Sequence, residues 1–204
     1  MGINNYIAEQ FSHPEGFVGE VVSFIMNMQN RRLYKETMRL LPLSDTDSVL
    51  DIGCGNDYML NMLARRYDCM FTGIDISASI VRSALKRNHK FVESGRMNII
   101  WQDILATSFV DCSFSRAYTV NTVYFWENLS EVMTEIHRIL KPNGYFINTL
   151  YSDKTLSRFP HTQFGYKRFP TDLLVREGLD AGFTATVSPI LDEAAYCIRY
   201  QKKP

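Results

Sequence analysis

Residues 48–60, SVLDIGCGNDYML, limit the fold of this chain more than any other segment. They open with a nearly continuous apolar run, which is typical of a strand buried on both faces of a sheet. Two glycines follow, Gly53 and Gly55, and a helical pattern then begins. A sharp turn after a strand needs backbone conformations that residues with a β-carbon avoid, and glycines also let a ligand approach backbone N–H groups closely. The segment therefore predicts a strand, a ligand-binding glycine turn and a helix.

The rest of the chain alternates between strand-like and helix-like patterns. Further strands are expected at residues 70–75, 97–104, within 115–126 and ending near Asn121, and at 145–151, 183–191 and 194–203. Helices are expected at residues 20–41, 58–67, 77–90, 128–140 (closed by a turn at 141–144) and 171–182. Repeated strand–helix units predict an α/β fold, with a parallel sheet, helices on both of its faces and a hairpin at the end of the chain.

Composition narrows the function classes. Lysine plus arginine equals aspartate plus glutamate, 22 of each, which argues against a nucleic-acid partner. The four cysteines form no CxxC pair and, with the four histidines, no metal-ligand spacing, so we expect reduced thiols, no metal and a cytoplasmic protein. The N-terminus lacks the pattern of a signal peptide, and no stretch has the apolar length of a membrane span.

Polar side chains stand where the predicted strands end. Asp75 follows Gly55 by about 20 residues, the spacing at which a carboxylate can accept both hydroxyls of a ribose. Asp103 ends the third strand and is suited to accept a hydrogen bond from an adenine amine. Ile76 and Ile104 offer apolar surface to the adenine ring. Because ligands of parallel sheets bind at the carboxyl ends of the strands, these residues predict a nucleoside site.

Asp57 stands where a dinucleotide-binding turn would continue towards its third glycine, and Tyr58 occupies the glycine position itself. Tyr58 would crowd a pyrophosphate and Asp57 would repel one. Asp51, just before the turn, adds a second carboxylate. Such a loop suits a cationic ligand, and S-adenosylmethionine (SAM) carries an ammonium and a sulfonium in addition to ribose and adenine.

Four segments in order, VLDIGCGND, GIDIS, WQDI and EIHRILKPNGYFI, resemble the signature segments of class I SAM-dependent methyltransferases, and more narrowly the type 11 small-molecule methyltransferases. The resemblance covers residues 47–150 and extends weakly into 11–41. It implies a Rossmann-like, seven-stranded, mostly parallel sheet with an antiparallel terminal strand. It also implies an N-terminal helical lid over residues 1–42 and a SAM-binding domain over residues 43–204.

The resemblance also implies roles for single residues. Asp51 would reach the methionine amine, and Gly53, Cys54 and Gly55 would place backbone against the methionine portion. Asp75 would bind the ribose hydroxyls, with Ile76 against the adenine. Asp103 and Ile104 would serve the adenine, and Asn121 would line the pocket near the methionine portion and face the acceptor.

Asp57 departs from the family pattern, which usually has glycine there. It could contact the ligand ammonium, cap the following helix, or mark altered cofactor use. Of these alternatives, capping is the one we favour slightly from the sequence.

The methyl acceptor is expected to be a small molecule, and the chemistry requires no obligatory catalytic residue, since the sulfonium carries the reactive group. Tyr124 and Trp126 follow the fourth strand and would either wall an acceptor pocket or pack the loop. His161 and Tyr166 lie in the irregular stretch after the fifth strand and, with Tyr124, are the candidates for a base. The alternatives are a non-catalytic SAM-binding protein, a nicotinamide-dependent oxidoreductase, and a methyltransferase that acts on protein or RNA.

Overall fold

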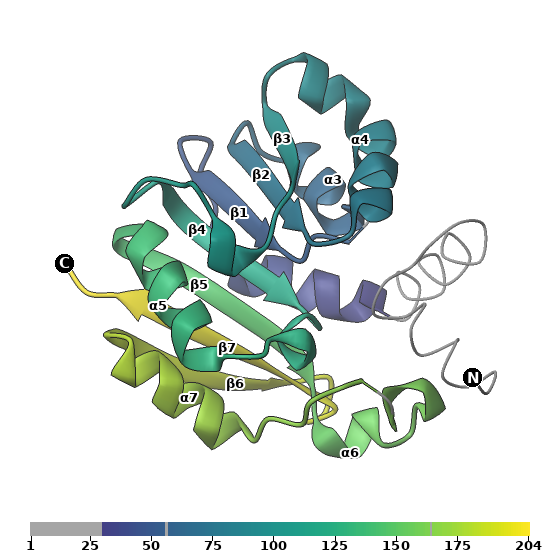
Figure 1. Ribbon diagram of the computed structural model, residues 1–204, viewed down its shortest axis with the longest axis vertical. Coiled ribbons are helices and arrows are strands. Elements are labelled where there is room, and N and C mark those ends of the chain that lie inside the picture. Colours follow the sequence, from purple (N-terminus) through teal and green to yellow (C-terminus); the bar gives the residue numbers. More distant parts are fainter. Residues whose placement is uncertain (1–29, 56, 164) are drawn as a thin grey trace.

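A computed structural model describes residues 30–204 except residues 56 and 164. Of His161 it describes the backbone but not the side chain. Seven strands form one sheet in the order β3-β2-β1-β4-β5-β7-β6 (Figure 1). The strands are β1 (Ser48–Ile52), β2 (Met70–Asp75), β3 (Met97–Trp101), β4 (Phe114–Val120), β5 (Leu140–Tyr151), β6 (Phe183–Ile190) and β7 (Ala195–Lys202). The α-helices are α3 (Tyr58–Ala64), α4 (Ala78–Glu93), α5 (Leu129–Ile139), α6 (Asp153–Leu156) and α7 (Thr171–Asp180). Short 3-10 helices are η1 (Ile104–Ala106), η2 (Val123–Phe125) and η3 (Pro160–Gln163).

The strand order confirms the predicted fold class. Strands β1 to β5 run parallel, and β7 pairs antiparallel with both β5 and β6. The strand order changes direction between β1 and β4, since β2 and β3 lie on one side of β1 and β4 and β5 lie on the other. The carboxyl ends of β1 and β4 therefore flank a crevice of the kind in which such sheets bind ligands. The predicted terminal hairpin is confirmed as β6 and β7.

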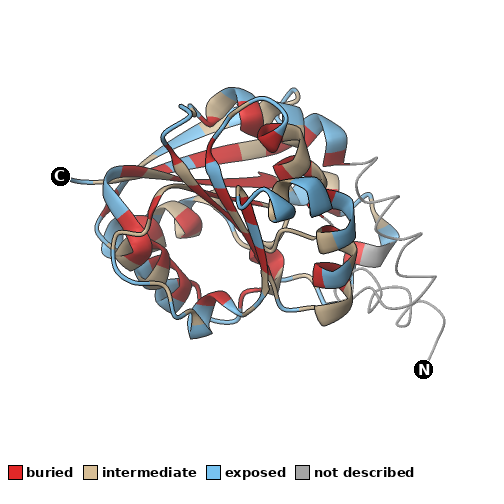
Figure 2. Cartoon of the chain, turned by 90° about the horizontal axis from the view of Figure 1, so that it is seen from above, coloured by how far each residue is buried: buried red, intermediate tan, exposed pale blue. Residues whose placement is uncertain are grey.

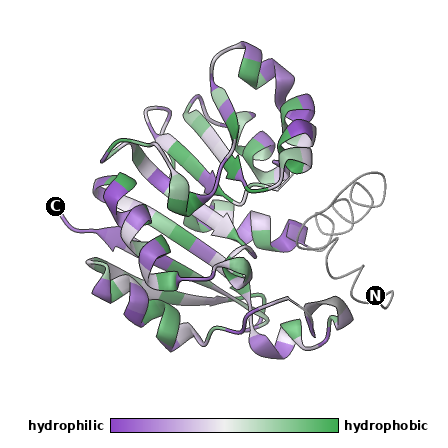
Figure 3. Cartoon of the chain, in the orientation of Figure 1, coloured by the Kyte–Doolittle hydropathy of each residue, from purple (hydrophilic) through white to green (hydrophobic). Residues whose placement is uncertain are grey.

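Helices cover both faces of the sheet because alternate strand residues point to opposite sides. Leu50, Phe146 and Tyr200 pack in the core beneath α5 and α7. Val49 and Ile147 pack in a second core beneath α3, α4 and the helical residues 30–40. Buried residues line the sheet and the inner sides of the helices in Figure 2, and apolar residues follow the strands in Figure 3.

The expected lid over residues 1–42 falls largely outside the described residues. Residues 30–40 are helical, in agreement with the end of the predicted helix 20–41. Leu33, Met38 and Leu41 of this part pack into the core beneath α3 and α4. The described end of the segment is therefore part of the folded domain.

The expected turn at residues 141–144 is instead an irregularity inside β5. Phe114 pairs with Leu140 but Arg116 pairs with Tyr145, so β5 has three more residues than β4 between these pairs and bulges out of the ladder. Asn143 in this bulge has a φ of 62°, which asparagine adopts more readily than most residues.

The turn between β6 and β7 holds three consecutive non-glycine residues with positive φ: Leu191, Asp192 and Glu193. Each costs roughly 1–2 kcal/mol in this conformation, which glycine adopts freely. Replacement of Asp192 by glycine is therefore expected to raise the free energy of unfolding by about 0.5–1 kcal/mol, after the larger loss of glycine entropy on folding. Urea denaturation measures this change. The matched change Asp180→Gly, inside α7, should lower stability, and equal effects at the two positions would contradict the strain argument.

Candidate functional site

The glycine turn joins the ends of β1, β2 and β4. The N–H groups of Gly53 and Cys54 both donate to the Ile74 carbonyl, at 2.9 and 3.0 Å. Gly53 has a φ of 69°, and a β-carbon there would lie 2.3 Å from Cγ2 of Thr122, just after β4. Gly55 has a φ of 57°, but a β-carbon there would meet no atom within 4 Å. Gly53 is thus required by close packing, whereas the side of Gly55 that would carry a side chain is open.

Asp75, the last residue of β2, fixes this turn. Its Oδ2 accepts a hydrogen bond from the Gly55 N–H at 3.0 Å, and its Oδ1 accepts one from the Ser77 N–H at 2.9 Å. A carboxylate oxygen can accept more than one hydrogen bond, so these backbone contacts are compatible with ribose hydroxyls on the same group. Ser77 also caps α4, as its side chain accepts from the Ile80 N–H. The carboxylate is therefore held in place between two loops.

The next loop supplies polar and apolar surface beside Asp75. Oδ1 of Asp103 accepts from the Leu105 N–H at 3.0 Å and caps η1. Ile76 is 49% exposed, whereas Ile104 is 5% exposed and packs in the core beneath α5. The structure therefore favours Ile76 over Ile104 as the apolar surface for a planar ring. Trp101, which sequence reasoning missed, is exposed and donates from Nε1 to the Ile76 carbonyl at 2.8 Å.

Asn121, directly after β4, links three parts of the chain. Its φ of 59° turns the chain sharply at the strand end. Its Nδ2 donates to Oδ1 of Asn30 at 2.8 Å, and its Oδ1 accepts from the Tyr151 N–H at 3.3 Å and from the Tyr124 hydroxyl at 3.2 Å. Asn30 was not expected at the site, because only the fold brings it to this strand end.

The aromatic candidates of the sequence behave differently from the expectation. Tyr124 is 1% exposed, and Trp126 is also buried, so neither walls an open pocket and the packing alternative is correct. The Tyr124 hydroxyl accepts from the Tyr151 N–H at 2.8 Å, and burial raises the pKa of Tyr124. Burial also raises the pKa of Tyr166 to about 12. Both phenols remain protonated at neutral pH, which argues against a role as base. His161 lies in η3, and its side chain is outside the described part.

Two buried carboxylates, Asp51 and Asp57, lie beside the glycine turn. Asp57 is 0% exposed, and neither of its oxygens has a hydrogen-bond partner among the described residues. It stands at the N-cap position of α3, but with a φ of 57° its side chain makes no capping hydrogen bond. The capping role favoured from the sequence is therefore wrong. The carboxylate points instead to the Cα of Gly73, where a β-carbon would lie 3.0 Å from Oδ1.

Burial controls the ionisation of this pair. Burial raises the pKa of Asp51 to about 8, against the opposing effect of the Tyr118 hydroxyl, and the charge of Asp75 raises it further. Burial also raises the pKa of Asp57 well above its ordinary value, and the charge of Asp51 adds to this effect. Tyr34, on the helical segment 30–40, lies near Asp51, and its ring centroid is 6.0 Å from that of Tyr58. Sequence reasoning missed Tyr34, since nothing local distinguishes it from a packing residue.

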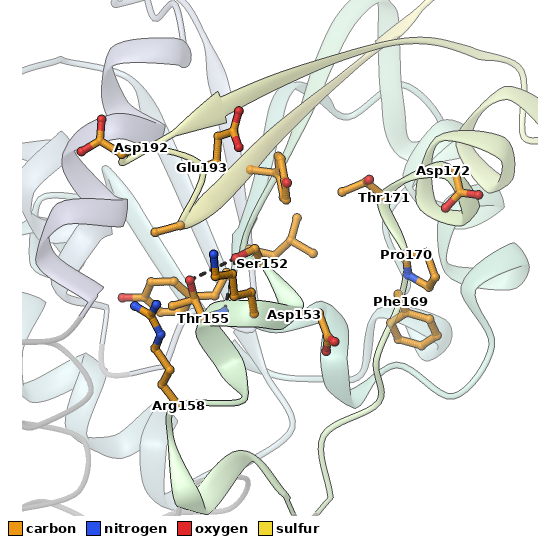
Figure 4. Close-up of a pocket in the computed structure, with 15 residues that line it drawn as sticks. Ser152, Asp153, Thr155, Arg158, Phe169, Pro170, Thr171, Asp172, Asp192 and Glu193 are labelled. Atoms are coloured by element: carbon orange, nitrogen blue, oxygen red, sulfur yellow. Dashed lines mark hydrogen bonds between the residues drawn. The ribbon is translucent and has the colours of Figure 1, made fainter.

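A cavity of about 460 Å³ opens at the carboxyl end of β5 (Figure 4). Its walls come from the end of β5, α6, the start of α7 and the β6–β7 turn. Tyr151, Phe169 and Tyr196 give it aromatic surface. Its charged lining residues are Asp153, Lys154, Arg158, Asp172, Asp192 and Glu193. Tyr151 connects this cavity to the Asn121 network, because its backbone N–H is bonded there.

In residues 30–204, with the gaps given above, no group of three histidine, cysteine or acidic side chains could hold a metal ion. No described helix is both long and apolar enough to cross a membrane.

Comparison with known proteins finds relatives in sequence and in fold. Residues 50–148 match the family described as Methyltransferase domain. The 27-O-demethylrifamycin SV methyltransferase of Amycolatopsis mediterranei is 31% identical over 113 residues, which are 55% of this chain and 42% of that protein. The chain spans about a third to a half of the first curated relatives that it matches.

Two solved structures share the fold. The complex between the Haloferax volcanii Trm112 methyltransferase activator and its methyltransferase gives a TM-score of 0.81 at 16% identity, with both chains covered completely. Geranyl diphosphate C-methyltransferase of Streptomyces coelicolor, solved with S-adenosyl-L-homocysteine (SAH), gives 0.73 at 14% identity over 96% of this chain and 87% of that one. At these identities the likeness shows the fold alone. Residues 50–148 thus match a methyltransferase domain in sequence, and the chain shares its fold with solved methyltransferases.

Proposed function

We propose that this protein transfers the sulfonium methyl group of SAM to a small-molecule acceptor. The observation that carries the proposal is the Asp75 carboxylate, which two backbone N–H groups hold beside the open side of Gly55. This arrangement fits a ribose whose hydroxyls bind Asp75 while the rest of the ligand lies along the glycine turn. The geometry therefore supports a nucleoside ligand without a pyrophosphate.

The remaining residues fit the other parts of SAM. Asp103 would accept from the adenine amine, and Ile76 would cover the ring, with Ile104 contributing through its backbone. Gly53, Cys54 and Gly55 would contact the methionine portion, whose ammonium would be balanced by Asp51. Asn121 would line the methionine end. The N-terminal segment 1–42, whose residues Leu33, Met38 and Leu41 pack on the domain, would cover the site and exclude water from the reacting atoms.

In the mechanism, SAM supplies the reactive methyl group, and the chain supplies position and electrostatics. The strand ends would hold the sulfonium towards Asn121, which a positive φ and three hydrogen bonds keep rigid. The phenols of Tyr124 and Tyr166 stay protonated, so they serve in packing and do not accept a proton during methyl transfer. No general base is assigned, and His161 remains a candidate.

The cavity at the end of β5 is our proposed acceptor site. Its volume lies within the range of small-molecule pockets, about 300–1,000 Å³. The relative from Amycolatopsis and the Streptomyces structure are named for small-molecule acceptors, which supports the same class here. The charge balance of the chain does not favour an RNA acceptor. The four cysteines are free, as expected for a cytoplasmic protein.

Filling the cavity should block the acceptor but not the cofactor. Thr171 lines the cavity at the start of α7. Thr171→Trp is expected to lower methyl transfer about tenfold or more, because a misplaced acceptor loses the aligned geometry. Labelled methyl transfer from SAM to the small-molecule fraction of a cell extract measures this loss. Thr186→Trp, on an exposed position of β6 outside the cavity, is the matched control. Equal transfer by the two variants would contradict the assignment.

Calorimetric titration with SAM, SAH and NADH tests the proposed function. Binding of SAM and SAH but not NADH is the expected result, since a pyrophosphate would meet the carboxylates of the turn. Binding of NADH alone would support a nicotinamide-dependent enzyme. Binding of SAM without transfer to any acceptor would favour a non-catalytic SAM-binding protein.

A further inference from the structure

A row of side chains crosses the sheet beneath α3 and the helical residues 30–40. Gly73 of β2 pairs with Asp51 of β1, and Asp51 pairs with Tyr118 of β4. Register partners of parallel strands point to the same face, so Asp51 and Tyr118 lie side by side in an apolar layer. Gly73 leaves a gap in this row. The side chains of Asp57 and Cys54 fill that gap, at 3.0 and 3.1 Å from the position of a β-carbon on Gly73.

Asp57 is therefore a buried carboxyl group close enough to a second one, Asp51, for the charge of Asp51 to raise its pKa. Both of its oxygens are buried, and in the described part of the chain neither makes a hydrogen bond of good geometry; the Cys54 thiol lies against the carboxylate and opposes the rise in its pKa. The positive group that faces the pair is Arg87 of α4, whose guanidinium lies 5.8 Å from the centroid of the Tyr58 ring. The titratable and charged groups around Asp51 and Asp57 are Tyr34, Cys54, Asp75, Arg87 and Tyr118.

Two neighbouring carboxylates in an apolar layer cannot both be ionised without a counter-charge. The pair must therefore retain a proton or acquire a cation. The proposed cofactor has an ammonium at its methionine end. Asp51 lies near the end of β1, just before the glycine turn that would bind that end.

We propose that Asp51 and Asp57 retain at least one proton in the free protein and release one to solvent when the ammonium of the cofactor binds. This inference rests on the proposed function. No covalent bond forms or breaks on the ligand; the protonated pair and the ammonium-bearing ligand give the complex and one proton. Asp57 is then a positioning residue that sets the charge of the ammonium site. Burial, which raises the pKa of both groups, supports the retained proton.

The proposal makes cofactor affinity depend on pH in a defined direction. Since a cation binds the ionised pair, affinity should rise by up to about tenfold per pH unit from pH 6. The rise should end as the ligand amine, with an ordinary pKa of about 8, loses its own proton.

Calorimetry of the full chain with SAH, in buffers of different ionisation enthalpy between pH 6 and 8, measures the released proton. At pH 6.5 we expect about one proton per SAH bound. 5′-Methylthioadenosine has the same nucleoside but no ammonium, and it should release none and bind with an affinity independent of pH. Equal release by the two ligands, or none by SAH, would overturn the proposal. Absence of SAH binding at every pH would contradict the proposed function as well.

Asp57→Asn tests whether Asp57 is one of the groups that retain the proton. Asparagine tolerates a positive φ and copies the shape of the protonated acid. Because one of the two carboxyl groups is removed, we expect the variant to release fewer protons per SAH bound than the wild type at the same pH. Asp103→Asn, at the adenine end, should weaken binding but keep the wild-type release. Unchanged release by Asp57→Asn would overturn the role of Asp57.

Thermal unfolding without ligand gives an independent readout. A carboxyl whose pKa is raised in the folded protein contributes stability below its unfolded pKa, about 3.9, and that contribution is lost as the pH rises. Relative to Asp57→Asn, the wild type should therefore lose several degrees of Tm between pH 4 and pH 8. Parallel Tm curves for the two proteins would overturn the retained proton.

Discussion

Asp75→Ala is expected to lower the affinity for SAH by about 100-fold or more. The carboxylate would accept two ribose hydroxyls, and hydrogen bonds to charged groups contribute about 1.5–3 kcal/mol each. Loss of about 3 kcal/mol corresponds to roughly a 100-fold change in the dissociation constant. The substitution also releases the N–H groups of Gly55 and Ser77, which hold the turn beside the ligand. Calorimetric titration with SAH measures the effect.

The control for this prediction is Asp180→Ala, an exposed carboxylate at the end of α7. It should leave SAH affinity within about twofold, because surface substitutions away from the site change little. Thermal unfolding of both variants must show a folded protein. An Asp75→Ala variant that is folded and binds SAH within threefold of the wild type would remove Asp75 from the site.

Gly53→Ala is expected to lower the free energy of unfolding by about 2–5 kcal/mol. Alanine at a φ of 69° costs roughly 1–2 kcal/mol, and its methyl group would lie 2.3 Å from Cγ2 of Thr122, an overlap that costs about 1–3 kcal/mol more. For a chain of this length the Tm should fall by roughly 5–15 °C. Thermal and urea unfolding measure the change.

Gly55→Ala provides the matched comparison. Its φ of 57° is similar, but the new methyl group meets no atom of the described residues within 4 Å, so only the backbone cost of roughly 1–2 kcal/mol applies. The two substitutions should have different effects: Gly53→Ala should lower the stability of the fold, whereas Gly55→Ala should mainly prevent SAH binding. Relief of the Gly53→Ala defect by Thr122→Gly would confirm the overlap, and equal stability loss at both glycines would contradict it.

Much of the fold could be predicted because its signals are local. The glycine turn, the serine cap of α4 and the alternation of strands with helices are each encoded within a few residues. The nucleoside positions follow from the same signals, since each one stands at the end of a strand. The bulge in β5 was not predicted, because a Lys-Pro-Asn-Gly run is equally typical of a turn.

The rest of the site depends on contacts between distant segments. Asn30 and Tyr34 reach the site only when the helix at 30–40 packs on the sheet. Tyr124 follows a strand end, as an acceptor-pocket residue would, but packing draws it into the core. Asp57 has the sequence position of a helix cap, but its carboxylate packs into the space beside Gly73 of β2. Sequence spacing places a residue on an element but does not say where its side chain packs.

A crystal structure of the protein with SAH tests the central claim most directly. The account predicts ribose hydroxyls on the Asp75 carboxylate, adenine against Ile76 near Asp103, and the methionine portion along Gly53 and Gly55 with its ammonium towards Asp51. A folded protein in which SAH occupies another place, or leaves the Asp75 carboxylate bonded to the backbone alone, would contradict the account.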